Sequence, residues 1–400
     1  MTDLQLNIMW HGPNTERLLR PLLDTFEKRH QLRVELHILD WNTAWPATLR
    51  AALQGEGPDV SEIGTSWLGS LLGMDALRPF RHYETLPLGG PAAFVPSAWQ
   101  VGSPAWLLPQ SFGETWAIPW WADTRILFYR RDLLARAGIA EEGAFDTHDA
   151  LVRTLERLAG SGVAIPLTLP THHSRMTIHL VASWIWGAGG DLISPGGTHT
   201  RFAEPAARAG IRDYYSLARF LAPSNHDLGD VESDAVYWRG EAAVTISGPW
   251  LLREASPDVV EHSGVLFPPG VPFVGGSQLV CWGHTRCGAE AVKLIQFLAG
   301  QEVQKALGQH AGLLPTRVDT LMQPPFSDMP VYWLVGRGLQ RGRSFPCVPL
   351  WGLVEDKLTG ALSNIWADVI NHPGANLDTI LTTHLNPLAR QLDVTLGGSR

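Results

Sequence analysis

Residues 1–70 alternate between strand patterns and helix patterns, and this alternation restricts the fold more than any other feature of the chain. Residues 4–8 and 34–38 alternate apolar with polar side chains over lengths that suit half-buried strands. Apolar residues recur at helical spacing between them, from Leu18 to Phe26, and a second helical pattern leads to a third apolar run, Val60 to Ile63. This strand–helix–strand–helix–strand order predicts a parallel sheet with right-handed crossovers.

The loops after these three strands are predicted to form a binding edge. Open parallel sheets bind ligands in the crevice beyond the carboxyl ends of their strands. The loops span residues 10–14, 40–42 and 64–67, and each places a tryptophan beside small polar groups. We therefore expect half of a binding site at this edge.

The chain is long enough for two lobes. Its 400 residues, 45% of them hydrophobic, exceed what one core usually supports. After a Pro- and Gly-rich stretch near residues 85–112, strand and helix patterns resume and continue to about Gln278. Helical patterns return at residues 288–307 and 354–396. The expected fold class is therefore α/β with two lobes, and a boundary is expected between Gly113 and Pro119.

Composition argues against several classes of protein. The 31 basic and 39 acidic residues give a net charge of -8 without a basic run, so no nucleic-acid partner is expected. No stretch approaches the ~18 apolar residues of a membrane span. The start, MTDLQLNIMW, lacks a signal-peptide pattern, which fits either a removed signal peptide or a cytoplasmic origin. Cys281, Cys287 and Cys347 lack metal-binding spacing and allow at most one disulfide, whose pairing stays open.

The segment PWWADTRILFYRR, residues 119–131, joins aromatic and charged side chains in a strand pattern. In an extended segment, successive side chains point to opposite faces, so Trp121 and Asp123 share one face while Trp120 packs on the other. Indoles beside hydrogen-bonding groups suit a ligand that is partly apolar and partly polar. Arg125 lies on the face of Asp123, where a structural ion pair with that carboxylate and a ligand contact are equally reasonable readings.

Several motifs stand in an order that resembles the extracellular solute-binding proteins of ABC sugar importers, the family 1 group that includes maltose-binding proteins. The resemblance covers nearly the whole chain, and no single piece of it is decisive. The pieces are AALQGEGPDVSEIGTSWLGSLL, AIPWWADTRILFYRRDLLARAGI, WIWGAGGDLISPGG, GEAAVTISGPW, GGSQLVCWGH, AEAVKLIQFLAGQEVQKAL and GLLPTR.

The resemblance implies a type II periplasmic-binding-protein fold whose lobes close on a sugar in the cleft between them and deliver it to permease subunits. It implies an N-terminal lobe of residues 1–116 and 283–325 and a C-terminal lobe of residues 117–282 and 326–400, with hinges near residues 113–119 and 278–283. It further implies a monomer in the periplasm or outside the cell, with a lipid anchor possible, and no cofactor, metal or catalysis.

The family's ligand contacts, carried over residue by residue, give the expected site. Aromatic faces would cover the apolar faces of sugar rings, and polar groups would bond to the hydroxyls. Gly64 stands where relatives often carry an acid, so the sugar is expected to differ from maltose. The expected ligand-binding residues are Asn14, Trp41, Asn42, Ser66, Trp67, Trp121, Asp123, Trp250, Gly275, Gly276, Ser277 and Arg343, with Arg343 as the main cation.

Two alternatives stay open from the sequence. A glycosidase or lyase could use scattered carboxylates such as Asp40 and Asp123, although no nucleophile elbow, Walker or zinc-protease motif is present. The same fold could bind a polyamine, a peptide or a phosphodiester, but a single acid and a single arginine among many indoles favour a neutral or weakly acidic sugar. His172 and His173 lack the spacing of a metal site and are expected in a loop.

Overall fold

The computed structural model describes residues 3–103, 114–311, 313–328, 331, 334 and 342–397, except for the side chains of Asn42, Arg253, His310 and Ala311. These residues form two compact units. Unit 1 comprises residues 1–123, 274–340 and 344–352, and unit 2 comprises residues 124–273, 341–343 and 353–400.

The unit boundaries differ from the lobe boundaries expected from the sequence. The chain leaves unit 1 after Asp123 rather than after residue 116, and it returns at Val274 rather than at residue 283. The reason is strand pairing, because the strands at 118–124 and 274–282 belong to the sheet of unit 1. Residues 278–282 of one expected hinge lie in the strand at 274–282, and residues 118 and 119 of the other begin the strand at 118–124.

Unit 1 is built on a seven-stranded sheet in the order β11-β5-β10-β3-β1-β2, with β4 paired to β10. The parallel pairing of β1 with β2 and β3 confirms the opening pattern. Its strands are β1 (Asp3–Met9), β2 (Arg33–Leu39), β3 (Val60–Gly64), β4 (Leu77–Arg78), β5 (Ile118–Thr124), β10 (Val274–Trp282) and β11 (Leu314–Pro315). Its helices are α1 (Thr15–His30), α2 (Trp41–Gln54), α3 (Leu68–Gly73), α4 (His82–Thr85), α5 (Pro96–Gly102), α12 (Gly288–Leu298), α13 (Gln301–Ala311) and α14 (Val318–Leu321).

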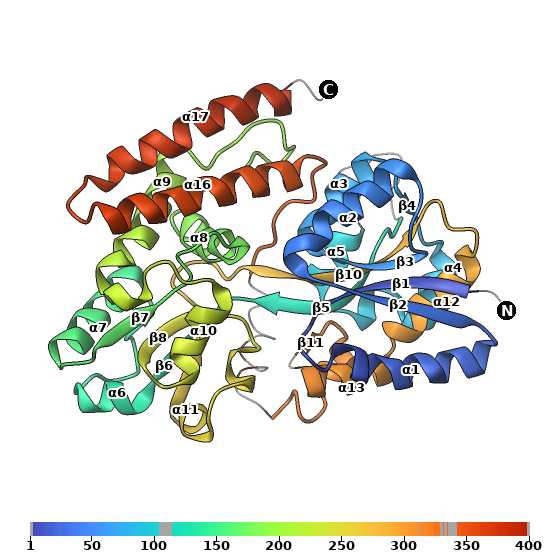
Figure 1. The fold of residues 1–400 in the computed structure, drawn as a ribbon, viewed down its shortest axis with the longest axis horizontal. Helices are drawn as coiled ribbons and strands as arrows, with labels where there is room; N and C mark the ends of the chain where they lie inside the picture. The colour runs from blue at the N-terminus through green and yellow to red at the C-terminus, as the bar shows by residue number, and fades with distance from the viewer. Residues whose placement is uncertain are drawn as a thin grey trace. The chain divides into compact units, whose positions relative to one another are not determined.

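Helices cover both faces of this sheet (Figure 1). Leu4, Leu6 and Ile8 of β1 pack with apolar residues of α1, α12 and α13 on one face. Met9 and Ile63 pack with residues of α2 and α3 on the other. β3 is buried along its whole length, as parallel strands usually are, whereas β1 and β2 keep some exposed side chains.

Unit 2 contains a four-stranded sheet in the order β7-β8-β6-β9. Its strands are β6 (Ile126–Arg130), β7 (Ile165–Thr168), β8 (Ala242–Ser247) and β9 (Ser263–Leu266). Its helices are α6 (Arg131–Arg136), α7 (His148–Gly160), α8 (Arg175–Gly187), α9 (Pro205–Ser216), α10 (Asp230–Trp238), α11 (Pro257–His262), α17 (Leu377–Gly397) and most of α16 (Trp351–Asn371). The Tyr215 hydroxyl of α9 donates to the Leu362 carbonyl of α16 at 2.6 Å, which ties the C-terminal helices to the unit.

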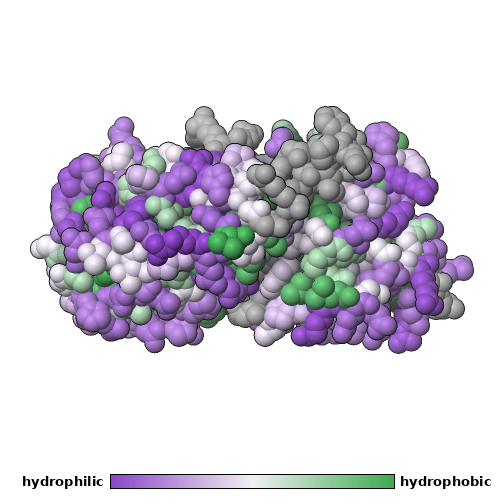
Figure 2. All heavy atoms as spheres, turned by 90° about the horizontal axis from the view of Figure 1, so that it is seen from above, coloured by the Kyte–Doolittle hydropathy of each residue, from purple (hydrophilic) through white to green (hydrophobic). Residues whose placement is uncertain are grey.

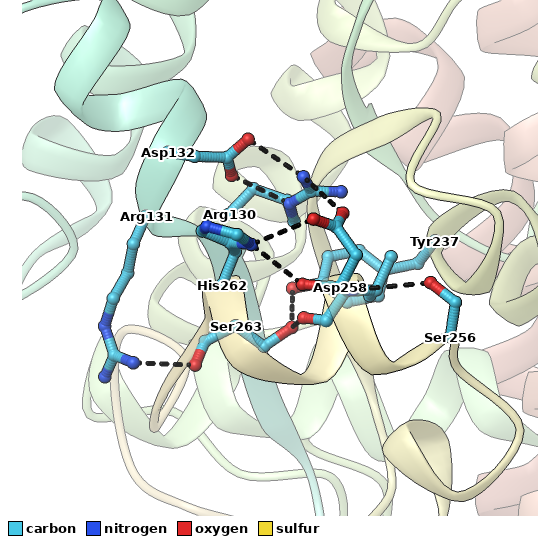
Figure 3. A network of polar contacts seen from close by, with 9 residues as sticks. Arg130, Arg131, Asp132, Tyr237, Ser256, Asp258, His262 and Ser263 are labelled. Carbon is cyan, nitrogen blue, oxygen red and sulfur yellow. Dashed lines mark hydrogen bonds and ion pairs between the residues drawn. The ribbon is translucent and has the colours of Figure 1, made fainter.

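A polar network fixes the end of β6 against α11 (Figure 3). The Arg130 guanidinium is buried and donates to both carboxylate oxygens of Asp132 at 2.8 Å, and it lies 3.4 Å from Asp258. Tyr237 and Ser263 bond through their hydroxyls at 2.9 Å, and the Ser263 hydroxyl donates to the Val259 carbonyl. Since each buried polar group has a partner, we assign this network to the stability of unit 2.

Polar and charged residues cover most of the face shown in Figure 2, and apolar residues form small separate patches on it. Among the described residues, no helix is both long enough and apolar enough to cross a bilayer.

Candidate functional site

The carboxyl ends of β1, β2 and β3 meet at one edge of the unit 1 sheet. Their parallel register places Met9 opposite Leu39 and Leu6 opposite Val60, so the loops that follow start side by side. Trp10 follows β1 directly, and its side chain is 48% exposed. Sequence reasoning identified this loop but took only Asn14 from it, and position at the strand end is the signal that points to Trp10 as well.

A hydrogen bond between His11 and the buried Glu62 supports this edge of the sheet. Glu62 of β3 is almost fully buried, and it accepts a hydrogen bond from the Met9 backbone N–H at 2.8 Å. Its carboxylate oxygens lie 2.9 and 3.0 Å from Nε2 of His11. The rings of Trp41 and Trp120 meet the His11 ring edge-on, at centroid distances of 6.0 and 6.2 Å. The sequence analysis missed this pair, which orders the loop after β1.

Trp41 and Trp67 differ in their access to solvent. Trp41 is the first residue of α2, not part of a loop as expected, and it is half-buried. Trp67 is only 3% exposed and packs in the core, with ring centroids 5.9 Å from Trp41 and 5.2 Å from Trp45. Gly64 lies against both Trp41 and Trp67, since an added Cβ would be 3.4 to 3.5 Å from their rings. Trp41 is therefore the better placed of the pair to cover a ligand.

Four further expected residues of unit 1 have polar side chains. Asn14 is exposed, and its side-chain oxygen accepts from Nε of Arg17 at 3.1 Å rather than capping α1. Ser66 is half-buried in the turn after β3. The Asn42 side chain lies outside the described residues. Asp123, the last residue of unit 1 on β5, is half-buried.

Gly276 serves the packing of two strands. Its φ of 131° is unfavourable for other residues, and an added Cβ would lie 2.0 Å from the Trp121 carbonyl oxygen. Gly275 beside it is half-buried, and Ser277 is buried opposite Gly64. The glycine pair lies inside β10.

Trp120 and Trp121 are both buried, with ring centroids 4.9 Å apart. Trp120 donates its indole N–H to the Leu298 carbonyl at 3.3 Å and belongs to the core of unit 1. Trp121 is 3% exposed and lines, with His11 and Thr15, a pocket of only about 10 Å³. That space is far below the ~300 Å³ or more of a typical ligand site. A sugar ring therefore does not fit in this pocket.

Trp250 is one of the expected site residues of unit 2, and its ring is held by other residues of that unit. It follows Gly248 and Pro249 after β8, it is half-buried, and its indole N–H donates to Oδ2 of Asp234 at 3.1 Å. Asp234 lies on α10 and is 5% exposed. The sequence analysis did not identify Asp234, because nothing in the pattern of α10 distinguishes it from a solvated acid.

Arg125 is a buried cation of unit 2, only 3% exposed. Its guanidinium carbon lies 5.3 Å from the centroid of the Trp250 ring and 5.4 Å from that of Phe273, within cation–π range. It also donates to the Thr124 carbonyl at 3.0 Å and to Nδ1 of His179 at 2.8 Å. An arginine cannot accept a hydrogen bond, so Nδ1 of His179 carries the lone pair here.

His179 links Arg125 to a buried acid. Its ring stacks on Phe273 at 4.4 Å with an interplanar angle of 8°. Its Nε2 lies 3.7 Å from Glu355 of α16, which is almost fully buried and also lies 3.7 Å from Arg175. Arg125 is thus held by His179 and Phe273, and its guanidinium in turn lies against the ring of Trp250.

Arg343, the expected main cation, is an exposed residue of unit 2. It donates to Oδ2 of Asp191 at 2.8 Å, and its guanidinium carbon lies 4.9 Å from the Trp186 ring centroid. Asp191 also accepts from the Trp186 indole at 3.3 Å. Arg343 is therefore oriented by its neighbours while its side chain stays accessible.

No group of three or more metal-ligating side chains occurs in the part of the chain that the structure describes. His172 is an exposed loop residue, as expected, and its Nδ1 lies 2.6 Å from Asp227. The three cysteines are free, so none of them pairs with another in this structure. The candidate residues instead provide aromatic faces and hydrogen-bonding groups for a ligand.

Asp234 is expected to make stability depend on pH. Burial raises the pKa of Asp234 to about 7, whereas an aspartate of the unfolded chain titrates near about 3.9. Between these values the folded protein keeps a proton that the unfolded chain loses, so this group's contribution to stability falls as the pH rises and levels off above about 7.

Asp234→Asn removes that proton equilibrium. Urea unfolding at pH 5 and pH 8 should therefore show the variant gaining roughly 2 kcal/mol relative to the parent protein over this interval. A difference between the two proteins that stays constant with pH would show that Asp234 titrates at its ordinary value in the folded protein.

Comparisons with known proteins agree with this architecture. Residues 22–330 match the family described as bacterial extracellular solute-binding protein. The chain is 22% identical over 353 residues to the diacetylchitobiose binding protein of Streptomyces coelicolor, covering 84% of this chain and 78% of that protein. It is 20% identical over 415 residues to the maltotriose-binding protein of Pyrococcus abyssi, covering 96% and 82%.

Solved structures show the same fold. An ABC transporter solute binding protein from Thermotoga lettingae, bound with alpha-D-tagatose, matches with a TM-score of 0.82 at 18% identity, covering 99% of this chain and 100% of that one. The sugar-binding protein MalE of Xanthomonas citri matches with a TM-score of 0.78 at 22% identity, covering 99% and 97%. The chain thus has the two-lobed α/β fold of periplasmic binding proteins, and it belongs to the bacterial extracellular solute-binding proteins.

Proposed function

We propose that this protein is the substrate-binding component of an ABC sugar importer, which captures a mono- or oligosaccharide and delivers it to the membrane permease. The observation that carries this proposal is that the exposed Trp10 and the half-buried Trp41 follow the neighbouring strands β1 and β2 at the carboxyl edge of the unit 1 sheet. Indole faces suit the apolar faces of sugar rings, and neighbouring polar groups suit the hydroxyls. The names of the relatives support a saccharide, since they refer to diacetylchitobiose, maltotriose and tagatose.

Each unit has candidate ligand-binding residues. In unit 1 these are Trp10 and Trp41 together with the other residues expected from the sequence, and in unit 2 they are Trp250 and Arg343. Buried residues such as Trp67 and Trp121 would then act by supporting their neighbours.

The proposed function also concerns where the protein acts and with which partners. Family membership supports action in the periplasm or outside the cell. We propose further that permease subunits are the partners and that the protein acts as a monomer without catalysis. Incubation with oligosaccharides should therefore leave them uncleaved.

Binding of a saccharide should raise the melting temperature and change the tryptophan fluorescence, because a ligand that binds only the native state stabilises it by mass action. The test is a thermal-shift screen of mono- and oligosaccharides, with polyamines, peptides and glycerol phosphodiesters in the same plate. A shift from one of these other classes, with every saccharide silent, would contradict the sugar proposal.

Trp10→Ala tests in that screen whether the exposed indole of Trp10 contacts the saccharide. The variant should lose about tenfold in affinity for the best saccharide, because a stacking face at the edge is removed. The matched control is Tyr83→Ala, which removes an aromatic side chain that is 60% exposed on α4 of the same unit. Equal affinities of the Trp10 and Tyr83 variants would show that Trp10 does not contact the ligand.

A further inference from the structure

The indole of Trp250 is held on several sides by residues of unit 2. Arg125 lies over its ring at 5.3 Å from the centroid. Gly248 contacts the ring so closely that an added Cβ would lie 2.1 Å from two of its carbon atoms. The indole N–H, its one hydrogen-bond donor, points to Oδ2 of Asp234 at 3.1 Å. These contacts restrict both the position and the rotation of the ring.

Asp234 is well suited to fix that rotation. Its carboxylate is buried on α10, a helix that packs against β8, the strand that leads into Trp250. A buried acid is unfavourable for folding unless its interactions compensate, and an apolar residue in its place would often stabilise the protein. Packing alone therefore does not explain a carboxylate at this buried position, whereas its hydrogen bond to the Trp250 indole does.

We propose that Asp234 is a positioning residue for ligand binding: it accepts the indole N–H of Trp250 and, together with Arg125 over the ring, holds Trp250 in the orientation that meets the saccharide. This inference rests on the proposed function, in which Trp250 contacts the sugar. Asp234 itself does not touch the ligand and acts through Trp250.

A double-mutant cycle with Asp234→Ala and Trp250→Phe tests the proposal at pH 8. Phenylalanine keeps an aromatic ring but has no N–H to donate, so the link to Asp234 is lost while a ring remains. Asp234→Ala should lower the affinity for the saccharide about tenfold in the parent protein and less than about twofold in the Trp250→Phe background, because interacting residues are not additive. Asp234→Asn should restore most of the affinity, since its amide oxygen can accept the same bond.

A second measurement does not need a ligand. The indole N–H resonance of Trp250, assigned by its loss in Trp250→Phe, should shift in Asp234→Ala and exchange faster with solvent. Glu232→Ala, which removes an exposed acid of the same helix, should leave both the resonance and the affinity unchanged.

The outcomes separate the two proposals. Equal losses of affinity from Asp234→Ala in both backgrounds, or an indole resonance that does not respond, would overturn the positioning role. If the resonance shifts but the protein binds no saccharide, the proposed function is rejected. Asp234 would then still orient Trp250, but this orientation would not serve a ligand. If Asp234→Ala does not fold, the affinity of Trp250→Phe tests the proposal instead. An affinity equal to that of the parent protein, without the indole N–H, would overturn it.

Discussion

Gly276→Ala is expected to destabilise unit 1 by roughly 3 kcal/mol. Gly276 has a φ of 131°, which residues with a Cβ rarely adopt, and the new Cβ would lie 2.0 Å from the Trp121 carbonyl oxygen. Neither β10 nor β5 can move freely, because each is paired inside the same sheet. Urea unfolding of the unliganded protein measures the loss.

Gly55→Ala is the matched control for Gly276→Ala. Gly55 also has a positive φ, 64°, but nothing lies within 4 Å of an added Cβ. This control should therefore lose only about 1 kcal/mol, the usual cost of a left-handed conformation. If Gly276→Ala were as mild as Gly55→Ala and instead weakened saccharide binding, the glycine would serve the ligand rather than the contact between β5 and β10.

The fold could be predicted from the sequence because it depends on local periodicity. The alternation in residues 4–8 and 34–38, and the helical spacing from Leu18 to Phe26, produced β1, β2 and α1 close to their expected positions. The unit boundaries could not be predicted, because they depend on which sheet the strands at 118–124 and 274–282 join. Strand pairing over more than 100 residues leaves no mark in a local pattern.

The candidate site was harder to predict than the fold, because burial decides which side chains can meet a ligand. Trp10, Trp67 and Trp121 all follow or lie in strands of one sheet, yet Trp10 is exposed and the other two are buried. Period-2 alternation gives the face of a strand but not what covers that face. Asp234 was missed for a similar reason, since its bond to Trp250 joins two elements that only the fold brings together.

Arg343→Met is expected to weaken saccharide binding about tenfold or more while changing the stability of the unliganded protein by less than about 1 kcal/mol. A guanidinium that bonds to sugar hydroxyls contributes roughly 1.5–3 kcal/mol, and about 1.4 kcal/mol corresponds to one decade of affinity. The side chain is accessible, and exposed ion pairs such as the one with Asp191 contribute little to folding. Titration calorimetry and urea unfolding measure the two quantities separately.

Two controls show whether the affinity depends on Arg343 itself. Arg219→Met removes another exposed arginine of unit 2, paired with Glu156, and should leave binding unchanged. Asp191→Asn removes the negative charge beside Arg343 but keeps the cation, so it should change affinity much less than Arg343→Met. Asp123→Asn tests the acid expected in unit 1, and it should also lose about tenfold in affinity if that carboxylate bonds to sugar hydroxyls. If Arg343→Met keeps the parent dissociation constant, its pairing with Asp191 and Trp186 is its whole role, and the cation that meets the ligand must be another residue.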